Sequence, residues 1–355
     1  MVGHSPDADY LRRLLSQVKP IIRNVCFVCT DKGKAIQSVL DDSGIPFECS
    51  VRVFSSREDF DFSVVRNMAR KMATKHSGWS IWLDCDDTME RPEQLLESIE
   101  RVEAEAYALP YEVSPTTANL FKVRVHKADE WHWINSVHEE LLPINQKGGQ
   151  KNVTLFRDLP IVHAPKPDKS NHDFHISLLK KQIKMSPNDY CYLAKEYYNK
   201  LDYEGAIPWI EKAIAIHDVS IEIYNLWIML GIAYAHQGNE ERMMDAFFSA
   251  IKERPHRREA YFYLAEYCGK KGGKFVLKGL AYITACNAQR DAGEALQHRK
   301  VYDSTGWKLH ARYLQKIGEW QAAMDIIENA TVKDDEYDQI VGECEQALKN
   351  EQEPS

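Results

Sequence analysis

An apolar run that stops at three acids stands at Gly78-Trp79-Ser80-Ile81-Trp82-Leu83-Asp84-Cys85-Asp86-Asp87. The run Trp79–Leu83 reads as a buried strand, and the three carboxylates that follow it repel one another and need a cation or strong donors. Hard oxygen ligands suit Mg²⁺ or Mn²⁺, so a divalent ion that carries phosphates would meet this need. The alternative is the acidic start of a helix, because the helix dipole favours Asp ahead of Arg91-Pro92-Glu93.

Length and composition limit the class of protein. The chain has 355 residues, 44% of them hydrophobic and 28% charged, which is typical of two ordinary folded domains. Its net charge of −8 removes the general attraction that non-specific binders of nucleic acid or anionic membranes show. The eight cysteines are scattered like reduced thiols. Residues 1–10 lack the pattern of a signal peptide, and no run reaches the roughly 18 to 20 apolar residues of a membrane span. We therefore expect a cytoplasmic protein without a membrane span.

The first half of the chain alternates strand-like and helix-like segments. Amphipathic segments indicate helices, and short apolar runs between them indicate buried strands. This alternation is typical of an α/β layered domain. The helices are predicted at 10–18, 35–40 and 63–74, and the strands at 25–28, 51–54 and 79–83.

From about residue 175 the pattern changes to almost continuous helix with an internal repeat. Leu193-Ala194, Leu230-Gly231 and Leu264-Ala265 recur at spacings of 37 and 34 residues, and a fourth unit is predicted at 308–330. This period fits tetratricopeptide units of about 34 residues, whose stacked helices form a concave surface for a partner. The same surface could join two copies in a homo-oligomer. A plain helical bundle with small packing residues is the alternative.

Two blocks of the first half resemble a known enzyme family. Residues 61–69 read Asp-Phe-Ser-Val-Val-Arg-Asn-Met-Ala, and together with 78–87 they resemble the D-F-S-x-x-R-N-x-A and W-L-D-A-D-E stretches of family 2 glycosyltransferases of the GT-A fold. Residues 131–141, which contain Val137-His138-Glu139, look like the V-H-E-x-L segment of the same subgroup, and Ile161-Val162-His163 resembles its late strand. A tetratricopeptide-like tail is also typical of that subgroup.

The resemblance implies a role for each matching residue. Asp84 and Asp86 match the D-x-D motif, with Asp86 as the direct ligand of Mn²⁺ or Mg²⁺ and Asp84 closer to the ribose of the donor. His163 matches the histidine that completes the metal site. Glu139 matches the general base that acts on the acceptor in an inverting displacement, and Arg66 would lie near the nucleotide or its diphosphate. These roles agree with chemistry, since a metal held by carboxylates neutralises the charge of a diphosphate leaving group.

Two stretches depart from the family pattern. The first strand is reduced to residues 1–6, and the loop after the second strand reads Val28-Cys29-Thr30-Asp31-Lys32-Gly33-Lys34. In the family both stretches hold the nucleotide base. Asp31 would take over this contact from a shifted loop; the alternatives are altered donor binding, or a fold retained without activity.

The resemblance thus implies a GT-A-like (Rossmann-like) α/β nucleotide-sugar domain at 1–170 and an all-α tetratricopeptide-like helical repeat domain at 175–348, joined through Pro165-Lys166-Pro167. The implied function is a metal-dependent inverting glycosyltransferase of the hexosyltransferase type. It would move a sugar from a nucleotide-sugar, expected to be a UDP-sugar, to a macromolecular acceptor such as a protein or peptide. One alternative is a non-catalytic repeat scaffold with a degenerate transferase domain. Another is transfer to modified nucleic acid, for which the basic candidates are Lys166, Lys169, Lys180, Lys181 and Lys184.

Overall fold

A computed structural model of the chain gives two compact units, Met1–Ile183 and Lys184–Ser355. The predicted linker Pro165-Lys166-Pro167 lies outside the described residues, as does Lys169. The structure describes residues 1–3, 5–56, 59–76, 78–112, 121–145, 152–163, 171–182, 184–289, 301–302 and 304–352.

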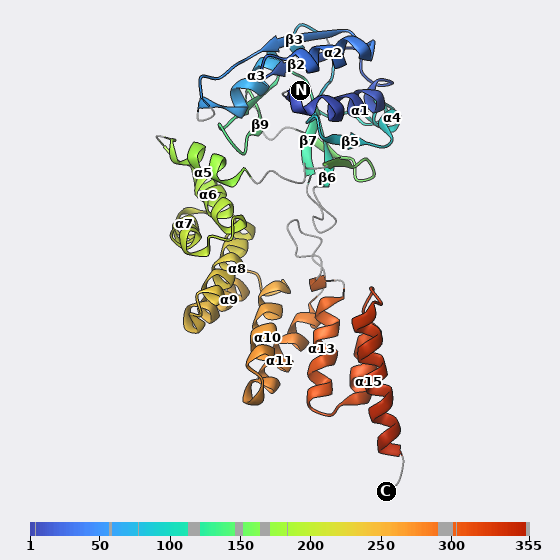
Figure 1. Cartoon of the computed structure of the whole chain (residues 1–355), viewed down its shortest axis with the longest axis vertical. Helices are drawn as coiled ribbons and strands as arrows, with labels where there is room; N and C mark the ends of the chain where they lie inside the picture. Colours follow the sequence, from blue (N-terminus) through green and yellow to red (C-terminus); the bar gives the residue numbers. More distant parts are fainter. Residues whose placement is uncertain are drawn as a thin grey trace. The chain divides into compact units, whose positions relative to one another are not determined.

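The first unit alternates strands and helices as far as α4, as the sequence predicts, apart from the consecutive strands β4 and β5, and then has six strands, β6 to β11, before its last helix (Figure 1). Its helices are α1 (Ala8–Val18), α2 (Lys34–Ser43), α3 (Phe62–Ala73), α4 (Pro92–Arg101) and α5 (His172–Lys180). Its strands are β1 (Val2–Gly3), β2 (Val25–Cys29), β3 (Phe47–Val51), β4 (Ser80–Ile81), β5 (Asp87–Met89), β6 (Ala106–Glu112), β7 (Phe121–His126), β8 (Trp131–Ile134), β9 (Glu140–Pro143), β10 (Val153–Leu155) and β11 (Ile161–His163).

The strands form three sheets. β1, β2 and β3 are parallel neighbours in that order. A mixed sheet has the order β4-β7-β6-β11-β5, with β10 paired to β6, and β8 and β9 form a separate antiparallel pair. The antiparallel register of β5 and β11 sets His163 directly opposite Asp87. A histidine near the end of one segment and an acid from a distant one are therefore brought together by strand pairing.

Two predicted strands differ from those in the structure. The strand expected at 51–54 lies earlier, as β3 at Phe47–Val51, because α2 ends at Gly44 in a left-handed conformation (φ 63°) and the chain extends from Pro46. Val51 and Val53 are 52% and 63% exposed, so their apolar character does not mark a buried strand. The strand expected at 79–83 is regular only over Ser80–Ile81.

The core of the first unit has helices on both faces of β2. Val28 packs with Val65 and Ala69 of α3, whereas Phe27 on the other face packs with Leu11 of α1. The opposite directions follow from the period of two along a strand. α4 continues the α1 side, where its Leu95 packs in one cluster with residues of α1, β5 and β6.

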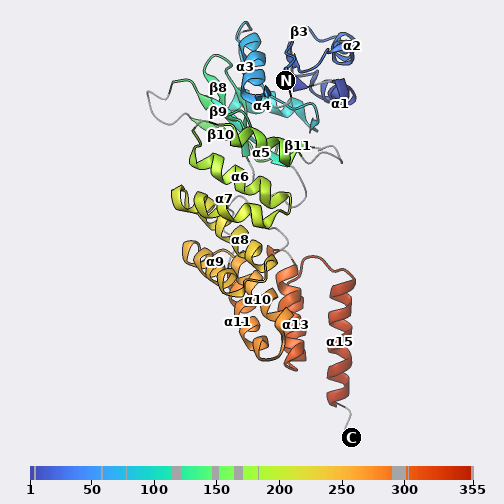
Figure 2. The ribbon, with the colours of Figure 1, turned by 60° about the vertical axis from the view of Figure 1, so that its left-hand side comes forward.

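The second unit is a succession of helical hairpins, which confirms the predicted repeat of paired helices. α6 to α9 follow one another as stacked layers in Figure 2. Within the described residues, no helix is both long and apolar enough to cross a membrane. The helices are α6 (Pro187–Asn199), α7 (Tyr203–Ile216), α8 (Ser220–His236), α9 (Glu240–Glu253), α10 (Glu259–Lys271), α11 (Val276–Ala288), α13 (Thr305–Lys316), α14 (Trp320–Ile327) and α15 (Asp335–Gln352).

The recurring small residues explain the close approach of paired helices. Ala194, Gly231 and Ala265 occupy buried positions in α6, α8 and α10, the first helices of successive hairpins. A methyl group added at Gly231 would lie 2.5 Å from the ring of Phe247 in α9. The repeat spacing in the sequence is therefore the spacing of these contacts.

Candidate functional site

The acids after β4 form a tight turn in which the three carboxylates have different surroundings. Asp87 N–H donates to the carbonyl of Asp84, and the N–H of Asp84 donates to Asp87 Oδ2 at 2.9 Å. Asp87 is fully buried, whereas the side chain of Asp86 remains 23% exposed. The turn thus directs Asp86 toward open space and Asp87 into the protein.

Asp87 holds His163 in place. Asp87 Oδ1 lies 3.1 Å from His163 Nδ1, and Asp86 Oδ1 lies 3.6 Å from the same nitrogen. Asp87 Oδ2 also accepts from Arg124 Nη1 at 3.0 Å. Because Asp87 engages Nδ1 of His163, this residue suits the role of an orienting carboxylate, and a cation would have to bind His163 through its other ring nitrogen, Nε2.

Asp86 and His163 fit the requirements of a divalent cation. One potential ligand atom from each of Asp86, Asp87 and His163 lies within 4.8 Å of the others. Burial raises the pKa of Asp86, and Asp84 and Asp87 add to this rise while His163 opposes it. Burial alone would lower the pKa of His163, but the hydrogen bond to Asp87 and the charge of Asp86 outweigh it and raise the pKa. Burial is the main cause of the shift at Asp86 and the neighbouring carboxylates are the cause at His163, and a bound cation would favour the charged form of Asp86.

A buried arginine, Arg124, pairs with the innermost acid of this cluster, Asp87. The guanidinium carbon of Arg124, in β7, lies 3.7 Å from the ring centre of Trp82 and 4.4 Å from that of Tyr111. Arg124 and Asp87 are both fully buried. Among the described residues, Arg124 Nε and Nη2 have no hydrogen-bond partner, so its stabilisation comes from the two rings, Asp87 and the carbonyl of Trp82, which accepts from Nη1 at 3.3 Å.

A second arginine joins the two remaining predicted acids. Arg66 Nη2 lies 2.8 Å from Asp84 Oδ1, and Arg66 Nε lies 2.5 Å from Glu139 Oε1. Its guanidinium carbon lies 4.9 Å from the ring centres of both Trp82 and Trp133. Burial would lower the pKa of Arg66, but Asp84 and Glu139 outweigh it and raise the pKa. Burial would raise the pKa of Asp84, but Arg66 and Arg124 reverse that effect and lower it.

Local structure explains the position of Arg66. The side chain of Asp61 accepts from the N–H of Val64 and caps α3, and the next turn carries Arg66. Asn67 then bonds the backbone of Trp133 in both directions, at 2.8 and 3.0 Å. The D-F-S-x-x-R-N pattern is therefore a helix start that fixes β8 beside the site.

Glu139 follows a strained turn between β8 and β9. Asn135 and His138 have φ values of 67° and 51°, in the left-handed region that non-glycine residues seldom occupy. Residues held in that region cost on the order of 1 kcal/mol and cluster at functional sites. The loop is fixed further by the N–H of Phe62, which donates to the carbonyl of Ser136.

Asp31 is engaged elsewhere. Its Oδ1 accepts from the N–H of Gly33 at 2.8 Å and from the thiol of Cys29 at 3.0 Å, both within its own loop. Burial, together with this hydrogen bond, raises the pKa of Cys29 to about 12. These bonds hold Oδ1 of Asp31 beside Cys29 and Gly33, and its contact with a nucleotide base stays a prediction.

The geometry therefore brings Asp84, Glu139 and Arg66 together and sets Asp86 beside His163. Sequence reasoning missed the roles of Asp87 and Arg124, and of Lys122, whose Nζ lies 4.3 Å from the ring centre of Tyr111. Burial lowers the pKa of Lys122, as does the charge of Arg124, while Asp84 and Glu139 oppose it. The available signal was the alternation of Lys122 and Arg124, which places two cations on one face of β7.

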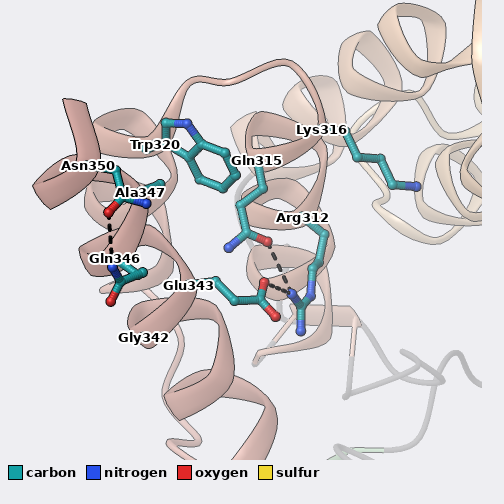
Figure 3. Close-up of a pocket in the computed structure, with 9 residues that line it drawn as sticks. All are labelled: Arg312, Gln315, Lys316, Trp320, Gly342, Glu343, Gln346, Ala347 and Asn350. Carbon is teal, nitrogen blue, oxygen red and sulfur yellow. Dashed lines mark hydrogen bonds and ion pairs between the residues drawn. The ribbon is translucent and has the colours of Figure 1, made fainter. Parts of the chain in front are cut away.

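The second unit carries a separate groove of about 720 Å³ between α13, the start of α14, and α15 (Figure 3). Arg312 in it contacts Glu343 at 2.6 Å and Gln315 at 3.1 Å, and Gln346 donates to Asn350 at 3.0 Å. Trp320 contributes one aromatic face. The exposed lining of the groove is mostly apolar, and the amide and paired charged groups add a smaller polar part.

Comparisons with known proteins give no family assignment. No family model matches the chain, and no curated protein matches it. Similar solved structures include the C-terminal part of a TPR repeat-containing protein from Cytophaga hutchinsonii. The match has 16% sequence identity and a TM-score of 0.37, and it covers 44% of this chain and 57% of that chain. The match to MamA has 15% sequence identity and a TM-score of 0.37, and it covers 50% of this chain and 92% of that chain. The match to YrrB, described as a TPR protein with an unusual peptide-binding site, has 16% sequence identity and a TM-score of 0.33, and it covers 51% of this chain and 82% of that chain.

Proposed function

We propose that this protein is a metal-dependent inverting glycosyltransferase that moves a sugar from a nucleotide-sugar, such as a UDP-sugar, to a protein or peptide acceptor. The observation that supports the proposal is the convergence of four acids, a histidine and two arginines at the ends of β4 and β11. The resemblance of residues 61–69, 78–87 and 131–141 to family 2 glycosyltransferases supports it independently.

Asp86 and His163 would hold Mn²⁺ or Mg²⁺, whose charge would stabilise the leaving diphosphate. Asp87 orients His163, and Arg124 balances the charge of Asp87. Asp84 would lie near the ribose of the donor. These residues form the donor side of the proposed site.

Glu139 would act on the acceptor side. Its carboxylate would take the proton of the acceptor hydroxyl as that oxygen attacks the anomeric carbon and the bond to the nucleotide diphosphate breaks. In the structure this carboxylate is bonded to Arg66 at 2.5 Å. The Arg66–Glu139 pair would therefore have to open before Glu139 could act, while Arg66 stays bonded to Asp84 or turns to the diphosphate.

A thermal-shift panel of nucleotide diphosphates and nucleotide-sugars, each with and without Mn²⁺, tests the proposal. A ligand at a hundredfold excess over its Kd stabilises the fold by about 2.7 kcal/mol. We expect a Mn²⁺-dependent shift with one nucleotide in the wild type, and its loss in Asp86→Ala. Asp42→Ala, which removes an exposed acid of α2, is the matched control and should keep the shift. No shift with any nucleotide, or an unchanged shift in Asp86→Ala, would contradict the proposed donor site.

The second candidate function is a non-catalytic scaffold that binds a partner through its helical repeats. It is favoured by the engagement of Asp31 within its own loop and by the groove between α13 and α15. Stacked helical hairpins commonly present such surfaces. If the nucleotide panel is silent while Trp320→Ala weakens binding of a protein partner, the scaffold function is the correct one.

A further inference from the structure

A cavity of about 430 Å³ interrupts the first unit between β2 and the segment 79–83. Ala69 and Ala73 of α3 line one face together with Arg66 and Arg70 of the same helix, and Val18 of α1 and Leu95 of α4 line another. Because α3 and α1 pack on opposite faces of β2, the cavity has helices on two sides and strand edges on the other two. This is the environment of a buried strand in an α/β layer.

The β2 edge of the cavity is already half paired. Val28 N–H donates to the carbonyl of Met1 at 3.0 Å, and the nitrogen of Met1 donates to the carbonyl of Cys26 at 2.8 Å. In a parallel ladder one residue in two offers both of its backbone groups to the same neighbour. By this alternation the N–H of Cys26 faces the cavity, one step beyond Met1.

The opposite edge belongs to β4. Ser80 and Ile81 pair with His126 and Val125 of β7, and Trp82 N–H donates to the carbonyl of Arg124. Antiparallel pairs alternate between hydrogen-bonded and non-hydrogen-bonded positions. Trp82 is a hydrogen-bonded position, so Ile81 is not, and its N–H and C=O point away from β7 toward the cavity.

A buried histidine adds a second sign of incompleteness. His126 lines the cavity and is 3% exposed, and its Nδ1 has no hydrogen-bond partner among the described residues. Buried polar atoms are normally paired. The cavity therefore combines two open backbone edges, apolar wall patches beside basic side chains, and an unsatisfied nitrogen.

We propose that this cavity is a strand-binding slot. It accepts an extended apolar peptide segment in line with β1, parallel to β2, which pairs with β2 on one edge and β4 on the other and joins the two sheets into one. The segment is about three residues long, the length of residues 24–26 at the start of β2, which line the cavity. Its side chains are apolar where they meet Ala69 and Ala73 of α3 on one wall and Val18 of α1 and Leu95 of α4 on the other. This inference does not depend on the proposed transferase activity.

The test adds residues directly before Met1 of the full chain. One variant carries Val-Ile-Val and its matched control carries Gly-Ser-Gly, so the two differ only in apolar area and strand propensity. We expect Val-Ile-Val to raise the Tm of the first unit by about 5 °C or more and Gly-Ser-Gly to leave it unchanged. Hydrogen exchange of the peptides that contain Cys26 and Ile81 should slow only with Val-Ile-Val. Equal Tm values, or equal exchange, for the two extensions would overturn the proposal.

A plugged slot shows whether the gain arises there. Ala73→Leu extends a side chain of α3 into the cavity. The rise in Tm produced by Val-Ile-Val, measured within the Ala73→Leu background, should fall to less than half. If the extension stabilises both backgrounds equally, it binds elsewhere and the slot is not its site.

Discussion

Replacement of Arg124 by Met tests whether the buried arginine supports the acid turn. Arg124 and Asp87 are both 0% exposed, and Arg124 Nη1 lies 3.0 Å from Asp87 Oδ2. Removing one member of a buried ion pair typically costs 3–5 kcal/mol, because the other charge stays buried. Asp87 keeps two other contacts, the N–H of Asp84 and His163, so we expect the lower end, about 3 kcal/mol.

Urea denaturation measures this loss, with hydrogen exchange in the peptides of β5 and β7 to separate the first unit from the helical unit. With a typical slope of about 2 kcal/mol per molar urea, the midpoint of the first unit should fall by about 1.5 M. Arg12→Met is the matched control, since Arg12 pairs with Asp9 on the surface at 56% and 93% exposure. Such exposed pairs contribute little, so its midpoint should stay within about 0.3 M of the wild type.

The double variant Arg124→Met/Asp87→Asn tests whether the loss of stability comes from the buried carboxylate of Asp87, which Arg124→Met leaves without its cation. If it does, the double variant is less destabilised than the sum of the two single variants by on the order of 1–3 kcal/mol. A fall of less than about 0.3 M in Arg124→Met, or strictly additive losses, would refute the reasoning.

Three further outcomes follow from single positions. Burial lowers the pKa of His126 to about 4, and the charge of Arg70 adds to this effect. As the pH falls, the unfolded chain therefore binds a proton at this histidine before the folded chain does, and the first unit should lose about 3 kcal/mol of stability between pH 6.5 and pH 4. Denaturation of His126→Phe across this range should show a smaller loss. Gly231→Ala should cost about 1–3 kcal/mol of stability, because the new methyl group meets Phe247 at 2.5 Å. Gly342→Ala should stabilise α15 by up to about 1 kcal/mol, because no atom lies within 4 Å of the new methyl group. A thermal melt that ranks the two variants the other way would contradict the packing argument. Isothermal titration with Mn²⁺ should show no binding to Asp86→Asn and about 10- to 100-fold weaker binding to Asp87→Asn, and equal losses would remove the distinction between ligand and orienting carboxylate.

The helical hairpins could be predicted because a sequence repeat of about 34 residues runs through this part of the chain. Leu230-Gly231 and its counterparts mark the same packing position in successive hairpins, and small residues at a fixed spacing survive in the sequence as a readable signal. The predicted strand at 51–54 was wrong for a physical reason. Val51 and Val53 are exposed, and what places β3 earlier is the left-handed Gly44 together with pairing to β2.

The site was only partly predictable for a related reason. Motif residues such as Asp86 and Arg66 stand in local patterns, a strand end and a capped helix start, which sequence alone reveals. Asp87 acquires its role only through the register of β5 against β11, which sets His163 opposite it. Arg124 likewise pairs with Asp87 across 37 positions of sequence, and its burial between Trp82 and Tyr111 has no local signature.

Trp82 connects the two halves of the site. Its ring contacts Arg124, which balances Asp87, and also Arg66, which joins Asp84 to Glu139. An arginine between two acids can leave one only if the other, or a new anion, compensates it, because an unpaired buried charge costs several kcal/mol. In the proposed reaction the diphosphate of the donor is that anion. Donor binding would then loosen the Arg66–Glu139 pair and free the carboxylate for the acceptor, which explains why one residue contacts the acids of both sides.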